Sequence, residues 1–204
     1  YPLPAGETRD GSTANKRRQA VNDMVQRVSY AIKNVNATYG KNVKFGISPP
    51  GIWKNSTSDV TGSKTSGSEA YYSVYADSRT WIQNEWIDYI VPQIYWKTGH
   101  AKADYETLVS WWSNEVKGTN VKLYIGQGVY NEEVAKQIGT QLSINKNYPA
   151  VKGSIFFSLR NIISDLQGCK RQIATFYNGT TSNVGSSNNV ENGQMSPLPN
   201  TTVP

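Results

Sequence analysis

The chain has 204 residues, of which 37% are hydrophobic and 18% are charged, and its formal net charge is +6. This length suits one domain with a substantial core. A single cysteine excludes an internal disulfide bond, and a single histidine excludes a site built from several histidines, so we expect no metal centre and no cofactor. The positive charges are scattered without a nucleic-acid-binding motif, so we expect no nucleic-acid partner. No apolar run is long enough to span a membrane.

Helices and strands are expected to alternate along the chain. A long amphipathic helix follows residue 13 and ends at Gly40. Strands are then expected at 43–48, 87–96, 121–126 and 151–158. Helices are expected between these strands, at 69–84, 105–116 and 132–145, and after the last strand to about residue 176. Asp104 is the expected N-cap of the helix at 105–116. Alternation of this kind predicts an α/β fold with a parallel sheet. Four strands suit a small open sheet or half of an eight-stranded barrel, and periodicity does not decide between them.

The composition changes near residue 178. Residues 178–204 are mostly Asn, Ser, Thr, Gly and Pro, and a segment with so few apolar residues does not bury enough surface to offset its ordering entropy. We therefore expect one folded domain over residues 1–177 and a disordered linker or tail over 178–204. The chain begins with Tyr1 and Pro2 instead of Met, so we expect further sequence upstream.

Aromatic residues give the first indication of function. Six Trp and 13 Tyr stand against four Phe. Trp and Tyr combine a flat apolar face with a polar edge, which suits the apolar face and hydroxyl rim of a sugar ring. Most of these rings are expected in the core, and the composition alone favours a carbohydrate ligand without locating it.

Four motifs resemble one bacterial family. They are FGISPPGIWKN at 45–55, YADSRTW at 75–81, WIDYIVPQIYW at 86–96 and LYIGQ at 123–127. In this order and spacing the chain resembles the bacterial glycosyl-hydrolase-like family ten from Tyr1 to about Ser164. One departure is Pro50, which stands where the family usually has Phe; it changes the wall of the loop after the first strand.

The resemblance implies a fold, a location and a substrate class. It implies a (β/α)8 TIM barrel, export from the cytoplasm, often as an envelope lipoprotein, and a glycan substrate such as cell-wall peptidoglycan. In the family an acidic motif ends barrel strand four, and Tyr1-Pro2 resemble its last two residues. The chain is then expected to hold strands five to eight. A half-barrel leaves open sheet edges and uncovered apolar surface, so we also expect self-association.

The sequence leaves the catalytic residues unknown. Glycoside hydrolysis normally needs two carboxyl groups, which in a barrel project from the carboxyl ends of strands. No expected strand ends in a carboxylate. Asp88 opens a strand, and Asp77 is expected inside a helix with a salt bridge to a neighbouring helix, so both are assigned structural roles. Other acidic residues in or near the loops of that face are expected to be solvated: Glu7, Asp10, Asp59, Glu69, Glu132 and Glu133.

The candidate substrate-binding residues stand at strand ends or in the following loops. They are Ser48, Trp53, Gln93, Tyr95, Trp96, Gln127 and Tyr130. Side-chain alternation places Tyr95 on the same face as Gln93, whereas Trp96 would reach the site only from the following loop. Trp53 is equally consistent with sugar stacking and with packing on the barrel rim. His100 is expected on the surface.

Three functions therefore remain open. The first is a glycoside hydrolase acting on a cell-wall or related glycan, in which this chain supplies sugar-binding residues and is inactive alone. The second is a non-catalytic glycan-binding module, and the third is a structural barrel with a degenerate site. Affinity for glycans and turnover by the longer protein distinguish the three.

Overall fold

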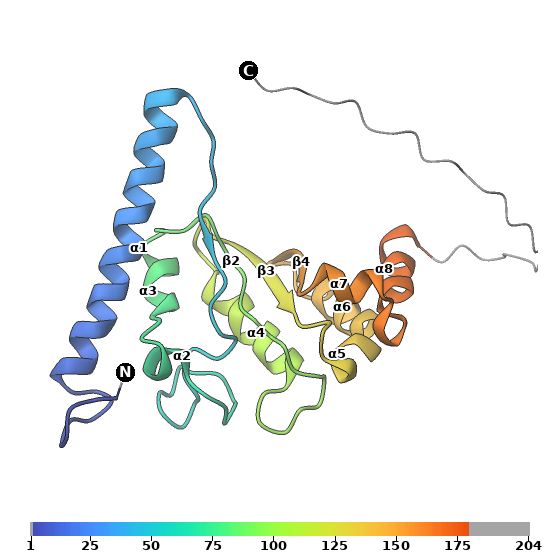
Figure 1. The fold of residues 1–204 in the computed structure, drawn as a ribbon, viewed down its shortest axis with the longest axis horizontal. Coiled ribbons are helices and arrows are strands. Elements are labelled where there is room, and N and C mark those ends of the chain that lie inside the picture. The colour runs from blue at the N-terminus through green and yellow to red at the C-terminus, as the bar shows by residue number, and fades with distance from the viewer. Residues whose placement is uncertain (1, 180–204) are drawn as a thin grey trace, which may run out of the picture.

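The computed structural model describes residues 2–179 and contains one parallel sheet (Figure 1). Its strands lie in the order in which they occur along the chain: β1 (Gly46–Ile47), β2 (Tyr89–Ile90), β3 (Lys122–Gln127) and β4 (Val151–Phe156). All neighbouring pairs are parallel, so the carboxyl ends of the strands lie at one edge of the sheet. The predicted α/β class with a parallel sheet is confirmed.

The helices alternate with these strands. Their bounds are α1 (Ser12–Tyr39), α2 (Ala70–Ser73), α3 (Ser78–Gln83), α4 (Tyr105–Glu115), α5 (Glu132–Lys136), α6 (Ile138–Lys146), α7 (Leu159–Ile163), the 3-10 turn η1 (Leu166–Gly168) and α8 (Cys169–Asn178). Helix α1 lies at one end of the row of elements and α7 and α8 lie at the other (Figure 1). Gly40 ends α1 in the left-handed conformation with φ of 62°, and Asp104 caps α4 by accepting from the Thr107 N–H at 2.9 Å, both as predicted.

The core lies between the sheet and the helix layer. Leu123 and Ile125 of β3 are fully buried and belong to one large apolar cluster with Trp112 of α4. A smaller cluster of Ile138, Leu142 and other residues holds α6 against α8. The opposite face of the sheet is less covered, because Ile155 of β4 keeps 46% of its surface exposed.

The structure corrects several predicted elements. The strand expected at 43–48 is regular only at Gly46–Ile47, and the helix expected after the last strand is divided into α7, η1 and α8. The helix expected at 69–84 is two short helices, because Tyr75 between them adopts a left-handed conformation with φ of 57°. The helix expected at 132–145 is interrupted at Gln137, which leaves helical geometry with φ of −109° and ψ of 11°. The strand expected at 87–96 is regular only at Tyr89–Ile90, since Pro92 has no N–H and pairing continues as an isolated bridge at Gln93.

Two further expectations concern the ends of the chain. The predicted tail lies outside the described residues from residue 180 onward, and the predicted boundary at 177 falls within the last turn of α8. Among the described residues, none of the helices is long and apolar enough to cross a membrane.

Candidate functional site at the carboxyl ends of the strands

Three aromatic rings meet where strands β2, β3 and β4 end. Tyr95 stacks on Phe157 with ring centroids 6.0 Å apart and an interplanar angle of 13°. Tyr130 packs edge-on against both rings, at 5.8 Å from Tyr95 and 5.9 Å from Phe157. Half of Tyr130 and 56% of Phe157 remain exposed. This aromatic cluster, Tyr95, Tyr130 and Phe157, offers apolar faces to a ligand at the edge where barrel enzymes place their sites.

Backbone contacts hold the aromatic cluster in place. The Phe157 N–H donates to the Gln127 carbonyl at 2.9 Å, and the Tyr130 N–H donates to the Phe157 carbonyl at 3.2 Å. Gly128 lies beneath the rings, and a Cβ there would stand 2.8 Å from Cγ of Tyr95. A glycine is therefore required for Tyr95 to lie against the end of β3. Burial raises the pKa of Tyr95, so its hydroxyl stays protonated and available as a hydrogen-bond donor at neutral pH.

Gln93 and Ser48 lie beside each other at the ends of β2 and β1. Gln93 Nε2 donates to the Ser48 carbonyl at 2.9 Å, and Ser48 Oγ donates to the Val91 carbonyl at 2.8 Å. Ser48 is exposed and Gln93 is half-buried, so both remain at the surface of the site. The predicted set of Ser48, Gln93, Tyr95 and Tyr130 thus lies along one edge of the sheet, and its substrate-binding role stays a prediction.

Gln127 and Trp96 point instead toward the helix layer. Gln127 is fully buried, and its Nε2 donates to Oε1 of Gln141 on α6 at 3.2 Å. The Trp96 carbonyl accepts from Gln141 Nε2 at 3.0 Å, and the Trp96 ring packs against the main core. Alternation explains the difference: Gln127 follows Leu123 and Ile125 on the inward face of β3. The prediction that Gln127 is a substrate-binding residue does not fit this burial.

Trp53 is buried within the loop after β1. Its ring stacks on Trp111 with centroids 5.9 Å apart, and its Nε1 donates to Asp77 at 3.1 Å. Cationic groups of Lys54 and Arg79 lie 4.7 Å and 4.6 Å from its ring centroid. Only 5% of Trp53 is exposed, so packing occupies the faces that a sugar would need. Of the two roles that the sequence left open for Trp53, the structure favours packing.

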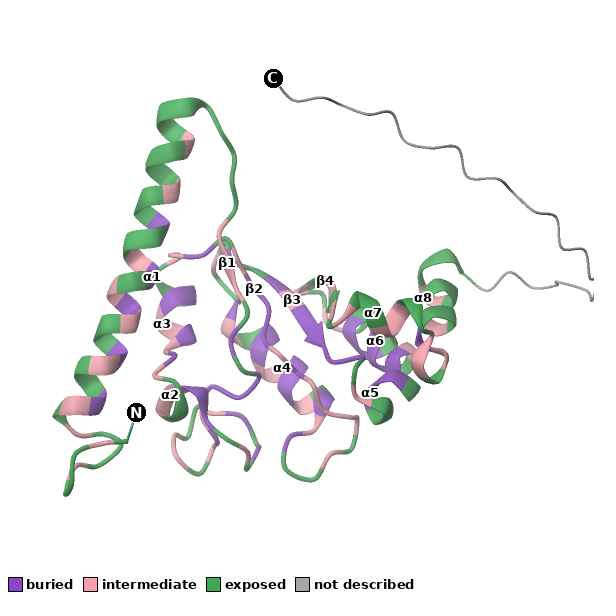
Figure 2. Cartoon of the chain, viewed as in Figure 1, coloured by how far each residue is buried: buried purple, intermediate pink, exposed green. Residues whose placement is uncertain are grey.

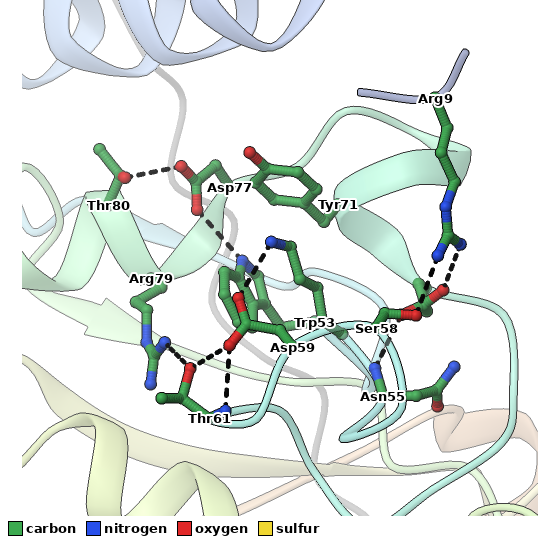
Figure 3. Close-up of polar contacts among 12 residues, drawn as sticks. Arg9, Trp53, Asn55, Ser58, Asp59, Thr61, Tyr71, Asp77, Arg79 and Thr80 are labelled. Carbon is green, nitrogen blue, oxygen red and sulfur yellow. Dashed lines mark hydrogen bonds and ion pairs between the residues drawn. The ribbon is translucent and has the colours of Figure 1, made fainter. Parts of the chain in front are cut away.

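Glu69 is the centre of a polar network that fixes this loop and includes Arg9 and Asn55, whose positions Figure 3 shows. Its Oε1 accepts from the Asn55 N–H at 2.8 Å, and its Oε2 accepts from Arg9 at 2.9 Å. Asn55 in turn donates to the Gly67 carbonyl at 2.9 Å. The contacts join the segment before α1 to both ends of the loop. Glu69 is therefore a structural carboxylate, and its pKa is lowered because these hydrogen bonds outweigh burial, which acts to raise it.

The other carboxylates considered in the sequence also make local contacts. Asp88 accepts from the Phe45 N–H at 2.8 Å, which confirms a structural contact at the opposite end of the sheet. Asp77 precedes α3 instead of lying inside a helix, and it accepts from Trp53 and Thr80 in place of the expected salt bridge.

The remaining contacts are Glu7 with Thr13, Asp59 with Thr61, Glu132 with Gln167, and Glu133 with Lys97. Within residues 2–179, no carboxylate stands at the carboxyl end of a strand, and no group of three metal-ligating side chains occurs.

The ionisation of Asp59 should make the stability of the same loop depend on pH. The Thr61 hydroxyl and N–H donate to Asp59 Oδ1 at 2.6 and 3.0 Å, and Lys54 lies 3.2 Å from Oδ2. These contacts, the Thr61 hydroxyl first, lower the pKa of Asp59 from 3.8 to about 2. Because the ionised form is favoured in the fold, its stabilisation is present above pH 4 and is lost as the pH falls toward 2.

We expect this contribution to be at most about 2 kcal/mol, reduced by partial exposure of the side chain. Urea unfolding at pH 6, 4, 3 and 2 measures it in the wild type and in Asp59→Asn. The variant should lose less free energy of unfolding between pH 4 and 2. Identical pH curves would show that Asp59 does not contribute.

The comparisons with known proteins agree with this fold. The family model described as "Glycosyl hydrolase-like 10" matches residues 4–148. The chain belongs to this family. It is 42% identical over 172 residues to "Glycosyl hydrolase YngK" of Bacillus subtilis (strain 168), covering 78% of this chain and 32% of that protein. It is 36% identical over 157 residues to "Glycosyl hydrolase DigH" of Escherichia coli (strain K12), covering 77% and 34%. The chain thus spans about a third of the length of these relatives.

Sequence reasoning assigned no role to Phe157, although it is the most exposed ring of the aromatic cluster. The alternation of side chains along β4 could have indicated that Phe157 is exposed, because it places Phe157 on the same face as exposed Ile155. The need for a glycine at position 128 was also not predicted, because it depends on the position of the Tyr95 ring, which follows a neighbouring strand.

Proposed function

We propose that this chain supplies the sugar-binding wall of a glycoside hydrolase that acts on a cell-wall glycan outside the cytoplasm. The observation that carries the proposal is the exposed aromatic cluster beside Gln93, at the carboxyl edge of the sheet, in a member of a glycosyl-hydrolase-like family. Stacked rings and a nearby amide are the two kinds of group that sugar recognition needs. The two relatives are both named glycosyl hydrolases, which supports the reaction class.

The catalytic carboxyl pair is proposed to come from outside the described residues. Within residues 2–179 the strand ends carry Ser48, Gln93, Gln127 and Phe157 instead of carboxylates. Neighbouring acidic side chains are engaged in loop and helix contacts, as Glu69 is with Asn55 and Arg9. A general acid and its partner need to flank the scissile bond, so the chain alone is expected to bind and not to cleave.

Two measurements on the purified chain test this proposal. Calorimetric titration with N-acetylglucosamine oligosaccharides, and co-sedimentation with purified peptidoglycan, measure binding. A reducing-end assay on both substrates measures cleavage. We expect measurable binding and no new reducing ends. Reducing ends released by the chain alone would overturn the assignment of the carboxyl pair, whereas absence of binding would favour a structural role.

Assays of a longer protein distinguish a hydrolase from a non-catalytic glycan-binding module. With the upstream coding sequence included, a hydrolase is expected to release reducing ends from the same substrates. A protein that binds them without any turnover would be a non-catalytic glycan-binding module. An export signal in that upstream sequence is the expected result for a protein acting on the cell wall.

A further inference from the structure

A groove runs along the side of α4 that faces away from the core; Figure 2 shows this helix buried along one side only. The volume of the groove is about 520 Å³, which is within the range of cavities that hold small ligands. Four residues of α4 line it at helical spacing and so share one side of the helix: Thr107, Ser110, Trp111 and Asn114. The rest of the lining is Gly62 and Lys64 of the loop after β1, Asp104, Glu106, and Tyr148 after α6.

The α4 groove is separate from the edge of the sheet described above. Helix α4 connects β2 and β3, which are the two inner strands of the sheet. The elements on both sides of it belong to this chain: Trp111 Nε1 donates to the Thr61 carbonyl at 2.8 Å, and the Tyr148 hydroxyl donates to Glu106 at 3.2 Å. No residue of the aromatic cluster lines the groove. A ligand in the groove would therefore occupy a second site.

Trp111 is held in a fixed orientation within the groove. Trp53 stacks on its ring with centroids 5.9 Å apart, and Trp112 packs edge-on with centroids 4.9 Å apart. The bond from Nε1 to Thr61 fixes the ring further. Trp111 remains half-buried, so part of the ring is open to a ligand. A ring fixed before binding loses little conformational entropy when a ligand stacks on it.

The charge of the lining disfavours an anionic ligand. Two carboxylates, Asp104 and Glu106, stand against one ammonium group, that of Lys64. A phosphate or nucleic-acid ligand needs the opposite balance, although the chain as a whole carries a net charge of +6. Lys64 and the amide nitrogen of Asn114 make no hydrogen bond with another described residue, so both can donate to a neutral polar ligand.

A peptide fits the α4 groove less well than a sugar chain. The backbone groups of α4 bond within the helix, so the groove offers no strand edge to an extended peptide. None of the described residues that line it is aliphatic, so an amphipathic helix would find no apolar anchors. Two aromatic rings, Trp111 and Tyr148, among hydroxyl and amide groups instead match the apolar ring faces and hydroxyl groups of a glycan.

We propose that the α4 groove is a second glycan-binding site, which holds a short segment of the same polymer that the aromatic cluster binds. The inference rests on the proposed function. Trp111 supplies the stacking surface, and Lys64 and Asn114 donate to sugar hydroxyl groups. A polymer that occupies both sites gains affinity because its second contact is intramolecular, whereas a disaccharide occupies one site at a time.

Two variants of the groove and one matched control test the proposal. Ser110→Arg fills the groove with a long side chain from a half-buried position on the side of α4 that faces away from the core. Ser143→Arg makes the same substitution at an exposed position of α6 outside the groove. Lys64→Ala/Asn114→Ala removes the two donors without adding bulk. Circular dichroism checks that all three variants are folded.

Co-sedimentation with purified peptidoglycan measures binding of the polymer, and calorimetric titration with the N-acetylglucosamine disaccharide measures binding at the aromatic cluster. We expect Ser110→Arg to bind peptidoglycan at least roughly tenfold more weakly than the wild type, and Lys64→Ala/Asn114→Ala to be weakened by a smaller factor. Ser143→Arg should bind as the wild type does. All three variants should keep the affinity of the aromatic cluster for the disaccharide.

Tryptophan fluorescence provides an independent measurement, because the aromatic cluster contains no tryptophan. N-acetylglucosamine oligosaccharides should change the emission of the wild type and of Ser143→Arg, and should not change that of Ser110→Arg or Trp111→Phe. An emission change that persists in Trp111→Phe would come from another indole and would overturn the assignment of the groove.

The outcomes distinguish the groove from the aromatic cluster. Equal binding of peptidoglycan by Ser110→Arg and Ser143→Arg would overturn the groove site, and Phe157→Ala/Tyr130→Ala would still show whether the aromatic cluster binds. Weak binding by Ser110→Arg together with full binding by Phe157→Ala/Tyr130→Ala would support the groove and overturn the role of the aromatic cluster. A wild-type chain that binds no peptidoglycan would overturn both.

Discussion

Replacing Trp112 with alanine is expected to lower the free energy of unfolding by about 3–5 kcal/mol. Trp112 is fully buried in the core between α4 and the sheet, and its Nε1 donates to the Gly51 carbonyl at 2.8 Å. The substitution leaves a large cavity and also a buried carbonyl without its donor. Urea unfolding followed by circular dichroism measures the change.

Two matched variants separate these causes. Trp112→Phe keeps most of the apolar volume and removes the hydrogen bond to Gly51, so it should cost about 1–2 kcal/mol. Trp111→Phe alters the neighbouring, half-buried ring, whose Nε1 donates to the Thr61 carbonyl in an exposed position, and should cost less than about 1 kcal/mol. Losses of the same size in all three variants would show that Trp112 does not form a central part of the core.

Local pattern was enough to predict the order of the elements, and it also predicted that the candidate residues Ser48, Gln93, Tyr95 and Tyr130 lie along one edge of the sheet. Alternation along residues 93–96 placed Tyr95 beside Gln93 and sent Trp96 to the other side, and the structure agrees. The same rule, applied to β3, would have turned Gln127 toward the helix layer with Leu123 and Ile125. Gln127 was predicted to bind substrate because it ends a strand, but it lies on the buried face of that strand.

Long-range contacts explain what the sequence did not predict. Trp53 is buried by Trp111, 58 residues later in the chain, and its N–H is satisfied by Asp77, 24 residues later. Neither contact has a local signature, because it depends on how the loop after β1 folds over α4. The break between α2 and α3 is similar: Tyr75 has no turn residue beside it, and its hydroxyl accepts from Arg17 on α1 at 2.7 Å. Contacts with distant elements therefore overrode the local helical pattern.

Removing the two exposed rings of the aromatic cluster is expected to have the largest effect on ligand binding. In Phe157→Ala/Tyr130→Ala, each lost ring should cost about 1 kcal/mol of stacking, so affinity for N-acetylglucosamine oligosaccharides should fall roughly 30-fold. Calorimetric titration of the purified chain measures this change. The fold should tolerate the double variant, because half of Tyr130 and 56% of Phe157 are exposed.

Two further variants show whether the rings themselves bind the sugar. Phe157→Tyr keeps a flat aromatic face and should retain affinity close to that of the wild type. Tyr39→Ala removes a ring that is even more exposed, at 68%, from the end of α1, at the other end of β1 from the aromatic cluster, and should not change binding. If the double variant binds as well as the wild type, the sugar lies elsewhere on the chain. If Tyr39→Ala weakens binding to the same extent, the affinity comes from exposed aromatic surface in general, and the aromatic cluster is not a specific subsite.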